Sequence, residues 1–239
     1  MHQKIIGVLG GMGPEATLDF YRKLIANTPA RTDQDHLRVI IDSNPKIPDR
    51  IRPILFGGVS PVPEMAASAL ALERAGADFI VMPCISAHFF LEELRTRCAL
   101  PIISILDVIA EQIEATHSQV NKIGLLATLG AIRAGQIQER LGRDGRATIV
   151  PEPDDQQIVI DAIRSIKDNQ CGLTREQIGI DVRRVSTRLI DRGAEAVVMA
   201  CTELPLVMGP GDLPVPVFDP LDLLARAAIR AAGSEPKIG

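Results

Sequence analysis

The chain lacks the features that mark membrane proteins and nucleic-acid-binding proteins. No apolar run approaches the roughly 18 residues that a membrane-spanning helix needs. Neither sign of charge dominates, because 26 Lys and Arg stand against 30 Asp and Glu, with both signs scattered along the sequence and a net charge of −4. A basic face for nucleic acid, or a polybasic face for a lipid surface, is therefore missing. We expect neither a nucleic acid nor a membrane as partner.

Cysteine is scarce, and its spacing argues against the usual cysteine-based sites. The chain has four cysteines and no C-x-x-C pair, which disfavours a redox disulfide. Neither Cys84 nor Cys201 belongs to a Cys/His set with zinc-ligand spacing, so we expect no metal. The N-terminal strand pattern runs into a Gly-rich loop by Gly10, which is unlike a signal peptide. We expect a cytoplasmic protein with reduced thiols, in which Cys98 and Cys171 have no functional role.

A repeat with an offset of 117 residues runs through the chain. The segment Gly76-Ala-Asp-Phe-Ile-Val-Met-Pro-Cys84 returns as Gly193-Ala-Glu-Ala-Val-Val-Met-Ala-Cys201. The same offset aligns Ile6-Gly-Val-Leu-Gly-Gly-Met-Gly13 with Ile123-Gly-Leu-Leu-Ala-Thr-Leu-Gly130. Two independent segments that share one offset indicate two copies of one structural unit. Each copy presents a cysteine at the end of a β-branched run.

The length and the repeat together predict two similar α/β domains. The 239 residues fit two domains of about 120 residues each, and an apolar fraction of 46% supplies a core for both. We expect the first domain to comprise 1–104 plus 217–239 and the second to comprise 105–216. Short β-branched runs alternate with helical patterns, which predicts parallel sheets flanked by helices on both faces.

The predicted strands and helices place the repeat cysteines at the ends of strands. Strands are expected at 4–9, 37–42, 78–83, 101–105, 122–127, 147–150, 195–200 and 215–218. Helices are expected at 14–27, 62–75, 86–97, 106–116, 131–141, 154–168, 174–191 and 221–231, with Thr174 and Gln177 forming a capping box. Ligands of such sheets bind beyond the carboxyl ends of the strands. The sequence therefore predicts a cleft between the domains in which two thiols face one carbon atom.

The loop from Gly7 to Ala16 has two interpretations. It contains G-x-G-x-x-A between a strand and a helix, and Asp42 ends the next strand, as in a dinucleotide-binding fingerprint. The matching loop from Gly124 to Gly130 lacks the pattern, which disfavours a nicotinamide cofactor. Free backbone N–H groups at a helix start bind a carboxylate as readily as a phosphate. We therefore favour an anion-binding loop.

Both repeat cysteines are expected near helix N-termini. Cys84 is followed by Ile85-Ser86-Ala87-His88, and Cys201 by Thr202-Glu203. A helix N-terminus and a nearby protonated histidine lower the pKa of a thiol from about 8.5 toward neutrality. The alternative is that both cysteines are buried and structural, and that His88 packs rather than assisting the thiol.

Two cations are candidates for gripping a carboxylate. Arg50 ends the polar, Pro-rich stretch 43–50, and a guanidinium binds a carboxylate through two parallel hydrogen bonds. From its spacing alone, this stretch is an ordinary solvated loop. Lys167 lies near the end of a predicted helix, where a cation ordinarily interacts favourably with the helix dipole.

Taken together, these motifs resemble the aspartate/glutamate racemase family, and within it the cofactor-independent aspartate racemases. The resemblance rests on Gly10-Gly11-Met12-Gly13-Pro14, Ser43-Asn44-Pro45, Ile47-Pro48-Asp49-Arg50, Met82-Pro83-Cys84 with Ala87-His88, Leu125-Leu126-Ala127-Thr128, and Cys201-Thr202-Glu203. It implies two α/β domains related by a pseudo-twofold axis, usually in a homodimer. It also implies that Cys84 and Cys201 are the catalytic pair. The substrate-binding candidates are Met12, Gly13, Arg50, Ser86, Thr128, Lys167, Thr202 and Glu203.

The resemblance implies racemisation of an acidic amino acid, aspartate first and glutamate next, without pyridoxal phosphate or metal. One cysteine removes the α-proton as a thiolate, and the other donates a proton to the opposite face as a thiol, so the two titrate as a coupled pair. Backbone N–H groups and the hydroxyls of Ser86, Thr128 and Thr202 would stabilise charge on the substrate carboxylate. Two rivals remain: a maleate-type cis–trans isomerase with a covalent cysteine, and a dicarboxylate-binding sensor.

The sequence departs from the family pattern at one position. The family usually reads Cys-Asn-Thr-Ala-His at the first cysteine, whereas this chain reads Cys84-Ile85-Ser86-Ala87-His88. Ser86 keeps a hydroxyl, but Ile85 lacks an amide expected to contact the polar groups of the substrate. A racemase of a different, less acidic amino acid is therefore a further alternative.

Overall fold

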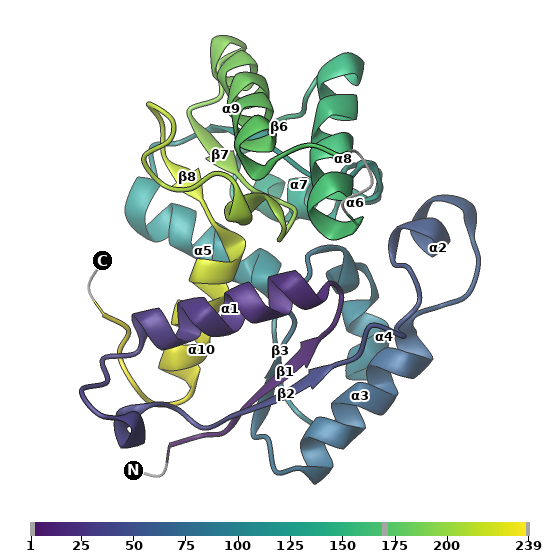
Figure 1. Ribbon diagram of the computed structural model, residues 1–239, viewed down its shortest axis with the longest axis vertical. Helices are drawn as coiled ribbons and strands as arrows, with labels where there is room; N and C mark the ends of the chain where they lie inside the picture. The colour runs from purple at the N-terminus through teal and green to yellow at the C-terminus, as the bar shows by residue number, and fades with distance from the viewer. Residues whose placement is uncertain (1–2, 169–171, 238–239) are drawn as a thin grey trace. The chain divides into compact units, whose positions relative to one another are not determined.

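The computed structural model in Figure 1 describes residues 3–168 and 172–237. The chain forms two compact units, Met1–Val108 with Leu221–Gly239, and Ile109–Pro220. Helix α5 (Ile105–His117) carries the chain from the first unit into the second. Cys171 lies outside the described residues.

The first unit contains a four-stranded parallel sheet in the order β2-β1-β3-β4. Its strands are β1 (Ile6–Gly10), β2 (Val39–Ser43), β3 (Phe79–Val81) and β4 (Ile102–Ile103). Every residue of β1 and β3 is buried. Uninterrupted apolar strands of this kind are typical of a parallel sheet with both faces covered, which is what the sequence predicted.

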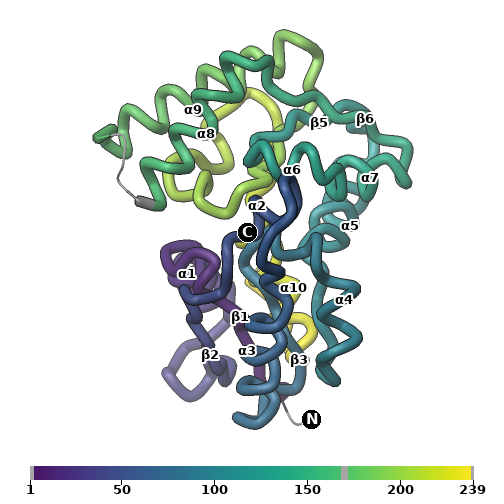
Figure 2. Tube along the Cα trace, turned by 90° about the vertical axis from the view of Figure 1, so that its right-hand side faces the viewer, coloured from purple at the N-terminus to yellow at the C-terminus, as the bar shows by residue number. Residues whose placement is uncertain are grey.

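Helices cover both faces of the first sheet. Helices α1 (Pro14–Asn27) and α10 (Pro220–Ala231) lie on one face, and α3 (Val62–Arg74) and α4 (Leu91–Arg95) lie on the other (Figures 1 and 2). Right-handed crossovers put α1 on the face opposite to α3 and α4, because the connection from β1 to β2 moves in the opposite direction to the connections from β2 to β3 and from β3 to β4. The described residues of the first unit also form the short helices η1 (Asp33–Asp35), α2 (Ile51–Phe56) and η2 (Ser86–Phe90).

The second unit repeats the same sheet in the order β6-β5-β7-β8. Its strands are β5 (Lys122–Leu125), β6 (Ala147–Ile149), β7 (Ala196–Val198) and β8 (Val217–Phe218). Its helices are α6 (Leu129–Ala134), α7 (Gln136–Arg143), α8 (Pro153–Asp168), α9 (Arg175–Asp191) and the short η3 (Leu204–Leu206). Helices α8 and α9 pack against each other (Figure 1). The repeat in sequence is thus a repeat of topology.

The predicted fold class is confirmed, and so is the capping box of Thr174 and Gln177 at the start of α9. Two predicted helices are broken. The pattern at 131–141 forms α6 and α7, separated by Gly135 at φ 72°, and the pattern at 86–97 forms η2 followed by α4. Of the helices in the described part of the chain, none has the length and apolar character of a membrane span.

Candidate active site

The strand order brings the candidate residues of each unit to one edge of its sheet. In the first unit β1 and β3 are neighbours, so the loop with Met12 and Gly13 lies beside the loop that carries Cys84. In the second unit β5 and β7 are neighbours, so Thr128 lies beside the loop that carries Cys201. In open α/β sheets ligands bind outside the carboxyl ends of strands, at the point where the strand order reverses.

The glycine-rich loop after β1 is held closely against its surroundings. Gly11 has φ +86°, and a side-chain carbon there would overlap the backbone of Asn44. The Gly11 N–H donates to the Thr17 hydroxyl at 2.9 Å, which in turn donates to the Gly13 carbonyl at 3.0 Å. Only glycine fits this approach without strain. The side chain of Met12 is buried in the core of the first unit, so this residue offers only its backbone to a ligand.

Arg50 is anchored to the protein backbone. Its guanidinium donates to the carbonyl of Met12 at 3.1 Å and to the carbonyl of Pro48 at 3.0 Å, while its Nε is buried without a partner among the described residues. Arg50 therefore ties the 43–50 stretch to the loop after β1. The stretch is not the freely solvated loop that its spacing alone suggested.

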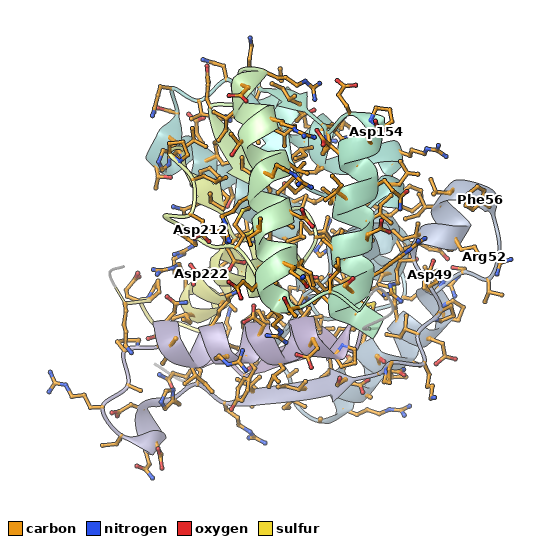
Figure 3. The ribbon with its side chains drawn as sticks, turned by 45° about the horizontal axis from the view of Figure 1, so that its top comes forward. Asp49, Arg52, Phe56, Asp154, Asp212 and Asp222 are labelled. Carbon is orange, nitrogen blue, oxygen red and sulfur yellow. The ribbon has the colours of Figure 1, made fainter. Side chains whose placement is uncertain are left out.

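The segment after Arg50 projects from the first unit. Figure 3 shows Arg52 and Phe56 on α2 and Asp49 just before it. The Asp49 carboxylate accepts the Arg52 N–H at 2.6 Å, and Phe56 is 76% exposed. A surface pocket of about 490 Å³ is lined by residues of the 48–59 segment. Sequence patterns gave no signal for this short helix.

Cys84 ends the turn after β3 as a buried, free thiol. Its N–H donates to the Met82 carbonyl at 2.8 Å, and its carbonyl accepts from His88 Nδ1 at 2.9 Å. The short helix η2 begins two residues later at Ser86, which is partly exposed, whereas Ile85 is 6% exposed. The strand and helix therefore fix the backbone of Cys84 on both sides.

His88 is a neutral side chain and does not act as a cation that lowers the pKa of the Cys84 thiol. Its Nδ1 bonds to the Cys84 carbonyl, and its Nε2 accepts the Ile105 N–H at 3.1 Å, so the neutral ring carries its proton on Nδ1. Burial lowers the pKa of His88 from 6.5 to about 4. The expectation of a cationic His88 that lowers the thiol pKa is wrong. This side chain packs, and it links Cys84 to the start of α5.

Thr128 caps α6, the helix that follows β5. Its hydroxyl accepts the N–H of Ala131 at 3.2 Å at the start of α6. A hydroxyl that accepts one bond still has its own proton to donate. The preceding residue, Ala127, is held by buried Gln156, whose amide donates to the Ala127 carbonyl at 2.9 Å. Gln156 also lines a surface pocket of about 380 Å³ and carried no signal in the sequence.

Cys201 belongs to a buried polar cluster. Its Sγ donates to Glu203 Oε2 at 3.1 Å, and the Thr202 hydroxyl lies 3.4 Å from the same oxygen. The other carboxylate oxygen of Glu203 lies 3.1 Å from Lys167 Nζ, which reaches it from the last turn of α8. Glu203 is 1% exposed, so its carboxyl group is buried, and Lys167 is its basic partner. Lys167 is therefore more than a charge at a helix end.

The environment of Cys201 opposes ionisation. Burial and then the negative charge of Glu203 raise the pKa of the Cys201 thiol well above its ordinary value, although Lys167 acts in the opposite direction. The expectation that a helix N-terminus brings this pKa toward neutrality is wrong. The helix that follows, η3, spans only Leu204–Leu206, and the nearest full charge is a carboxylate.

Each unit thus presents a buried cysteine thiol beside a loop at the carboxyl edge of a parallel sheet, which is where α/β proteins bind their ligands. The model of the Asp/Glu/hydantoin racemase family matches residues 9–228. The chain belongs to this family and is an amino-acid racemase family enzyme.

Known relatives cover nearly the whole chain. The aspartate racemase of Picrophilus torridus is 31% identical, with a TM-score of 0.84 over 98% of this chain and 96% of that one. An aspartate racemase homologue from Pyrococcus horikoshii is 28% identical, with a TM-score of 0.77 over 97% and 100%. The broad specificity amino-acid racemase RacX of Bacillus subtilis is 27% identical over 94% of this chain and 96% of its own.

Proposed function

We propose that the protein racemises an acidic amino acid without pyridoxal phosphate, using Cys84 and Cys201 on opposite faces of the substrate α-carbon. The observation that carries the proposal is the repeated placement of these thiols. Both thiols are buried and free. Cys84 follows β3, which neighbours β1 and its glycine-containing loop, and Cys201 follows β7, which neighbours β5 and its glycine-containing loop. Inversion of a stereocentre by proton transfer needs one acid and one base on opposite faces, and two equivalent units supply such a pair.

The chemistry requires different protonation states at the same moment. One sulfur is a thiolate that removes the α-proton, and the other is a thiol that protonates the resulting carbanion from the other side. The roles exchange in the reverse direction, so the pair titrates as a coupled system. Cys201, which donates a hydrogen bond to Glu203, is suited to begin as the acid. Cys84 then begins as the base.

Charge on the substrate carboxylate would be stabilised by fixed donors. Backbone N–H groups of the loop with Met12 and Gly13 lie at the start of the long helix α1, where the helix dipole favours an anion. The hydroxyls of Ser86 and Thr128 supply further donors, whereas the hydroxyl of Thr202, which the sequence also suggested, donates its proton to Glu203. Such preorganised donors contribute most when they point at charge that develops during the reaction.

Aspartate is the first candidate substrate and glutamate the next. Membership of the Asp/Glu/hydantoin racemase family and the similarity to the Picrophilus torridus aspartate racemase support this order. We assign Arg50 and Lys167 to the second carboxylate of such a substrate. Each of these cations would keep its contacts within the protein when the substrate binds.

A racemase of a less acidic amino acid is the second candidate, because both cations have partners within the protein. Lys167 pairs with Glu203, and Arg50 donates to the backbone carbonyls of Met12, Ile47 and Pro48. Ile85 also puts an apolar side chain next to Cys84. The Bacillus subtilis relative is a broad specificity racemase, which is consistent with a relaxed substrate range.

Enantiopure amino acids in D₂O test both candidates. Loss of the α-proton is followed by NMR, and inversion by chiral chromatography, for aspartate, glutamate, alanine, serine and several larger apolar amino acids. We expect aspartate to be turned over fastest, with activity unaffected by EDTA and by hydroxylamine treatment. Faster turnover of alanine or serine would favour the second candidate, and a covalent adduct detected by mass spectrometry would favour an isomerase mechanism.

We further propose that the protein acts as a homodimer in the cytoplasm. Helix α1 exposes Leu18, Tyr21 and Ile25 at spacings of three and four residues, which places an apolar stripe on one side of the helix. Cys84, Cys98 and Cys201 are free thiols, as a reducing compartment would keep them. Sedimentation analysis of the purified chain tests the oligomeric state, and a monomer at micromolar concentration would contradict the proposal.

A further inference from the structure

A pocket of about 380 Å³ lies in the second unit, and of the described residues that line it none belongs to the site proposed above. It is formed by α6, by the residues that follow β6, and by the first two turns of α8. Because α6 follows β5, and β5 and β6 are neighbours, the pocket lies at the carboxyl edge of the second sheet. Its volume is at the lower end of the range of about 300–1,000 Å³ that is usual for small-molecule sites.

Most of the wall of this pocket is apolar. The apolar residues that line it are Leu129, Ile132, Val150, Pro151, Pro153 and Ile160. The four aliphatic side chains among them are partly exposed. Covering these side chains with a ligand removes apolar surface from water, which is favourable. The pocket is therefore suited to the apolar body of a small molecule.

The charge at this pocket favours an anion. Arg133 is the charged side chain among the described residues that line it, and it is exposed, with no ion-pair partner in the described part of the chain. The first turn of the long helix α8 forms another part of the wall, and a helix dipole favours an anion at this end. Two carboxylates of that turn act in the opposite direction. Asp155 is paired with Arg188, however, and Asp154, labelled in Figure 3, is exposed and does not line the pocket.

Gln156 brings a hydrogen-bonding group to the same pocket. The residue is 7% exposed, and its Nε2 donates to the Ala127 carbonyl at 2.9 Å. Its Oε1 is buried without a partner among the described residues. Buried amide oxygens in folded proteins normally accept a hydrogen bond. A donor on a ligand, acting directly or through one ordered water, would satisfy this oxygen.

We propose that this pocket is a second ligand site, which binds a small carboxylate with an apolar body and an amino or hydroxyl group next to the carboxylate. The carboxylate binds the Arg133 guanidinium through parallel hydrogen bonds. The amino or hydroxyl group serves Gln156 Oε1, and the apolar body lies against Ile132 and Ile160. An α-amino acid with an apolar side chain and the corresponding α-hydroxy acid both have this chemistry.

Occupancy of this site acts on the loop that carries Thr128. Leu129 directly follows Thr128, and Gln156 holds the carbonyl of Ala127 on the other side. A ligand that fixes Leu129 and Gln156 restricts the motion of Thr128, so less freedom is lost when the substrate of racemisation binds. This coupling, unlike the ligand site itself, rests on the function proposed above, in which Thr128 is a donor to the substrate. Coupling is reciprocal, so the substrate tightens the binding of the ligand by the same factor.

Methyl NMR of the full chain tests the site, with 1-aminocyclopentane-1-carboxylate as the probe. This amino acid has no α-proton, so a racemase cannot turn it over. Isoleucine methyl labelling, with peaks assigned from Ile132→Val and Ile160→Val, reports on the pocket directly. We expect both peaks to shift to saturation during the titration.

Two further probes define the ligand. Cyclopentanecarboxylate lacks the donor, so we expect it to bind about two- to tenfold more weakly than 1-hydroxycyclopentane-1-carboxylate, which is the worth of one hydrogen bond. The tighter binder of the amino and hydroxy probes identifies which of the two classes the site prefers. Cyclopentanecarboxylate that binds as tightly as both would overturn the role of Gln156 Oε1.

Arg133→Gln tests the charge of the site. It removes a guanidinium from an exposed position, so we expect the amino probe to bind at least about tenfold more weakly, as the loss of a hydrogen bond between charged groups gives. Arg143→Gln, which replaces an exposed arginine of α7 outside the pocket, is the matched control and should bind the probe as the wild type does. Ile132 and Ile160 peaks that stay in place up to the solubility limit of the probe, or equal binding by Arg133→Gln and the wild type, would overturn the site.

Aspartate separates this pocket from the site of racemisation. We expect aspartate to strengthen binding of the amino probe, whereas displacement of the probe by aspartate would place it at the site of racemisation and overturn the second site. A saturating probe should lower the KM of racemisation about fivefold or more in the wild type, and leave it unchanged in Arg133→Gln. An unchanged KM in the wild type would overturn the coupling to Thr128.

The second ligand site and the proposed function can fail separately. A chain that racemises no amino acid, although the probe shifts the Ile132 and Ile160 peaks and Arg133→Gln weakens its binding, would overturn the proposed function and leave the second ligand site standing. A chain that racemises aspartate while both peaks stay in place would overturn the second ligand site alone.

Discussion

Acidification should destabilise the first unit through His88. The ring is buried and joins two backbone groups, donating to the Cys84 carbonyl from Nδ1 and accepting the Ile105 N–H at Nε2. Protonation adds a proton at Nε2, which then opposes the Ile105 N–H. Burial accordingly lowers the pKa of His88 from 6.5 to about 4.

The sign of the effect follows from proton binding. Because the pKa is lower in the folded state, the unfolded chain binds more protons, and the free energy of unfolding falls as the pH falls from about 6.5 toward 4. The contribution is complete above pH 6.5. Between pH 8 and pH 5 the two pKa values correspond to a loss of about 2 kcal/mol from this one side chain.

Urea unfolding of the wild type and His88→Gln at pH 8 and pH 5 measures this loss. Glutamine can donate to one backbone group and accept from the other, and it does not titrate. We expect the wild type to lose about 2 kcal/mol more than His88→Gln over this interval. Equal losses in the two proteins would show that His88 titrates in the folded protein as it does in the unfolded chain, and the reasoning would fail.

Two further predictions concern the loops at the site. Gly11→Ala should lower the free energy of unfolding by more than Gly57→Ala, because both sites have positive φ, costing about 1–3 kcal/mol, but only Gly11 faces the backbone of Asn44. Urea denaturation of both variants checks this, and equal losses would contradict it. Ile85→Asn should raise kcat/KM on aspartate about ten- to a hundredfold, the worth of one hydrogen bond to a charged group. Losses on every acidic substrate would show that Ile85 is adapted to another substrate.

The sequence predicts the fold well because hydrophobic runs and glycines act locally. The strands and most helices follow from apolar runs, and the 117-residue offset predicts that both sheets share one strand order. The break between α6 and α7 could also have been predicted, since Gly135 adopts the left-handed conformation that often ends a helix. The division of 86–97 into η2 and α4 has no comparable marker.

The contacts within the site depend on tertiary structure and were less predictable. Glu203 meets Lys167 across 36 positions of sequence, so a cation that the sequence suggested for the substrate also belongs to the cluster around Cys201. His88 meets the N–H of Ile105 only because η2 packs beside the start of α5. Residue types alone suggested a cation assisting a thiol, whereas burial decides that the ring is neutral.

The most direct test of the two-thiol mechanism compares Cys84→Ala and Cys201→Ala with the wild type. Each purified protein is incubated in D₂O with L-aspartate and separately with D-aspartate, and inversion is followed by chiral chromatography. Each variant should lose at least about 10²-fold in turnover in both directions, because positioned proton transfer contributes about 10²–10⁴ in rate and each thiol serves one face. Turnover above about a tenth of the wild-type rate in either variant would contradict the mechanism.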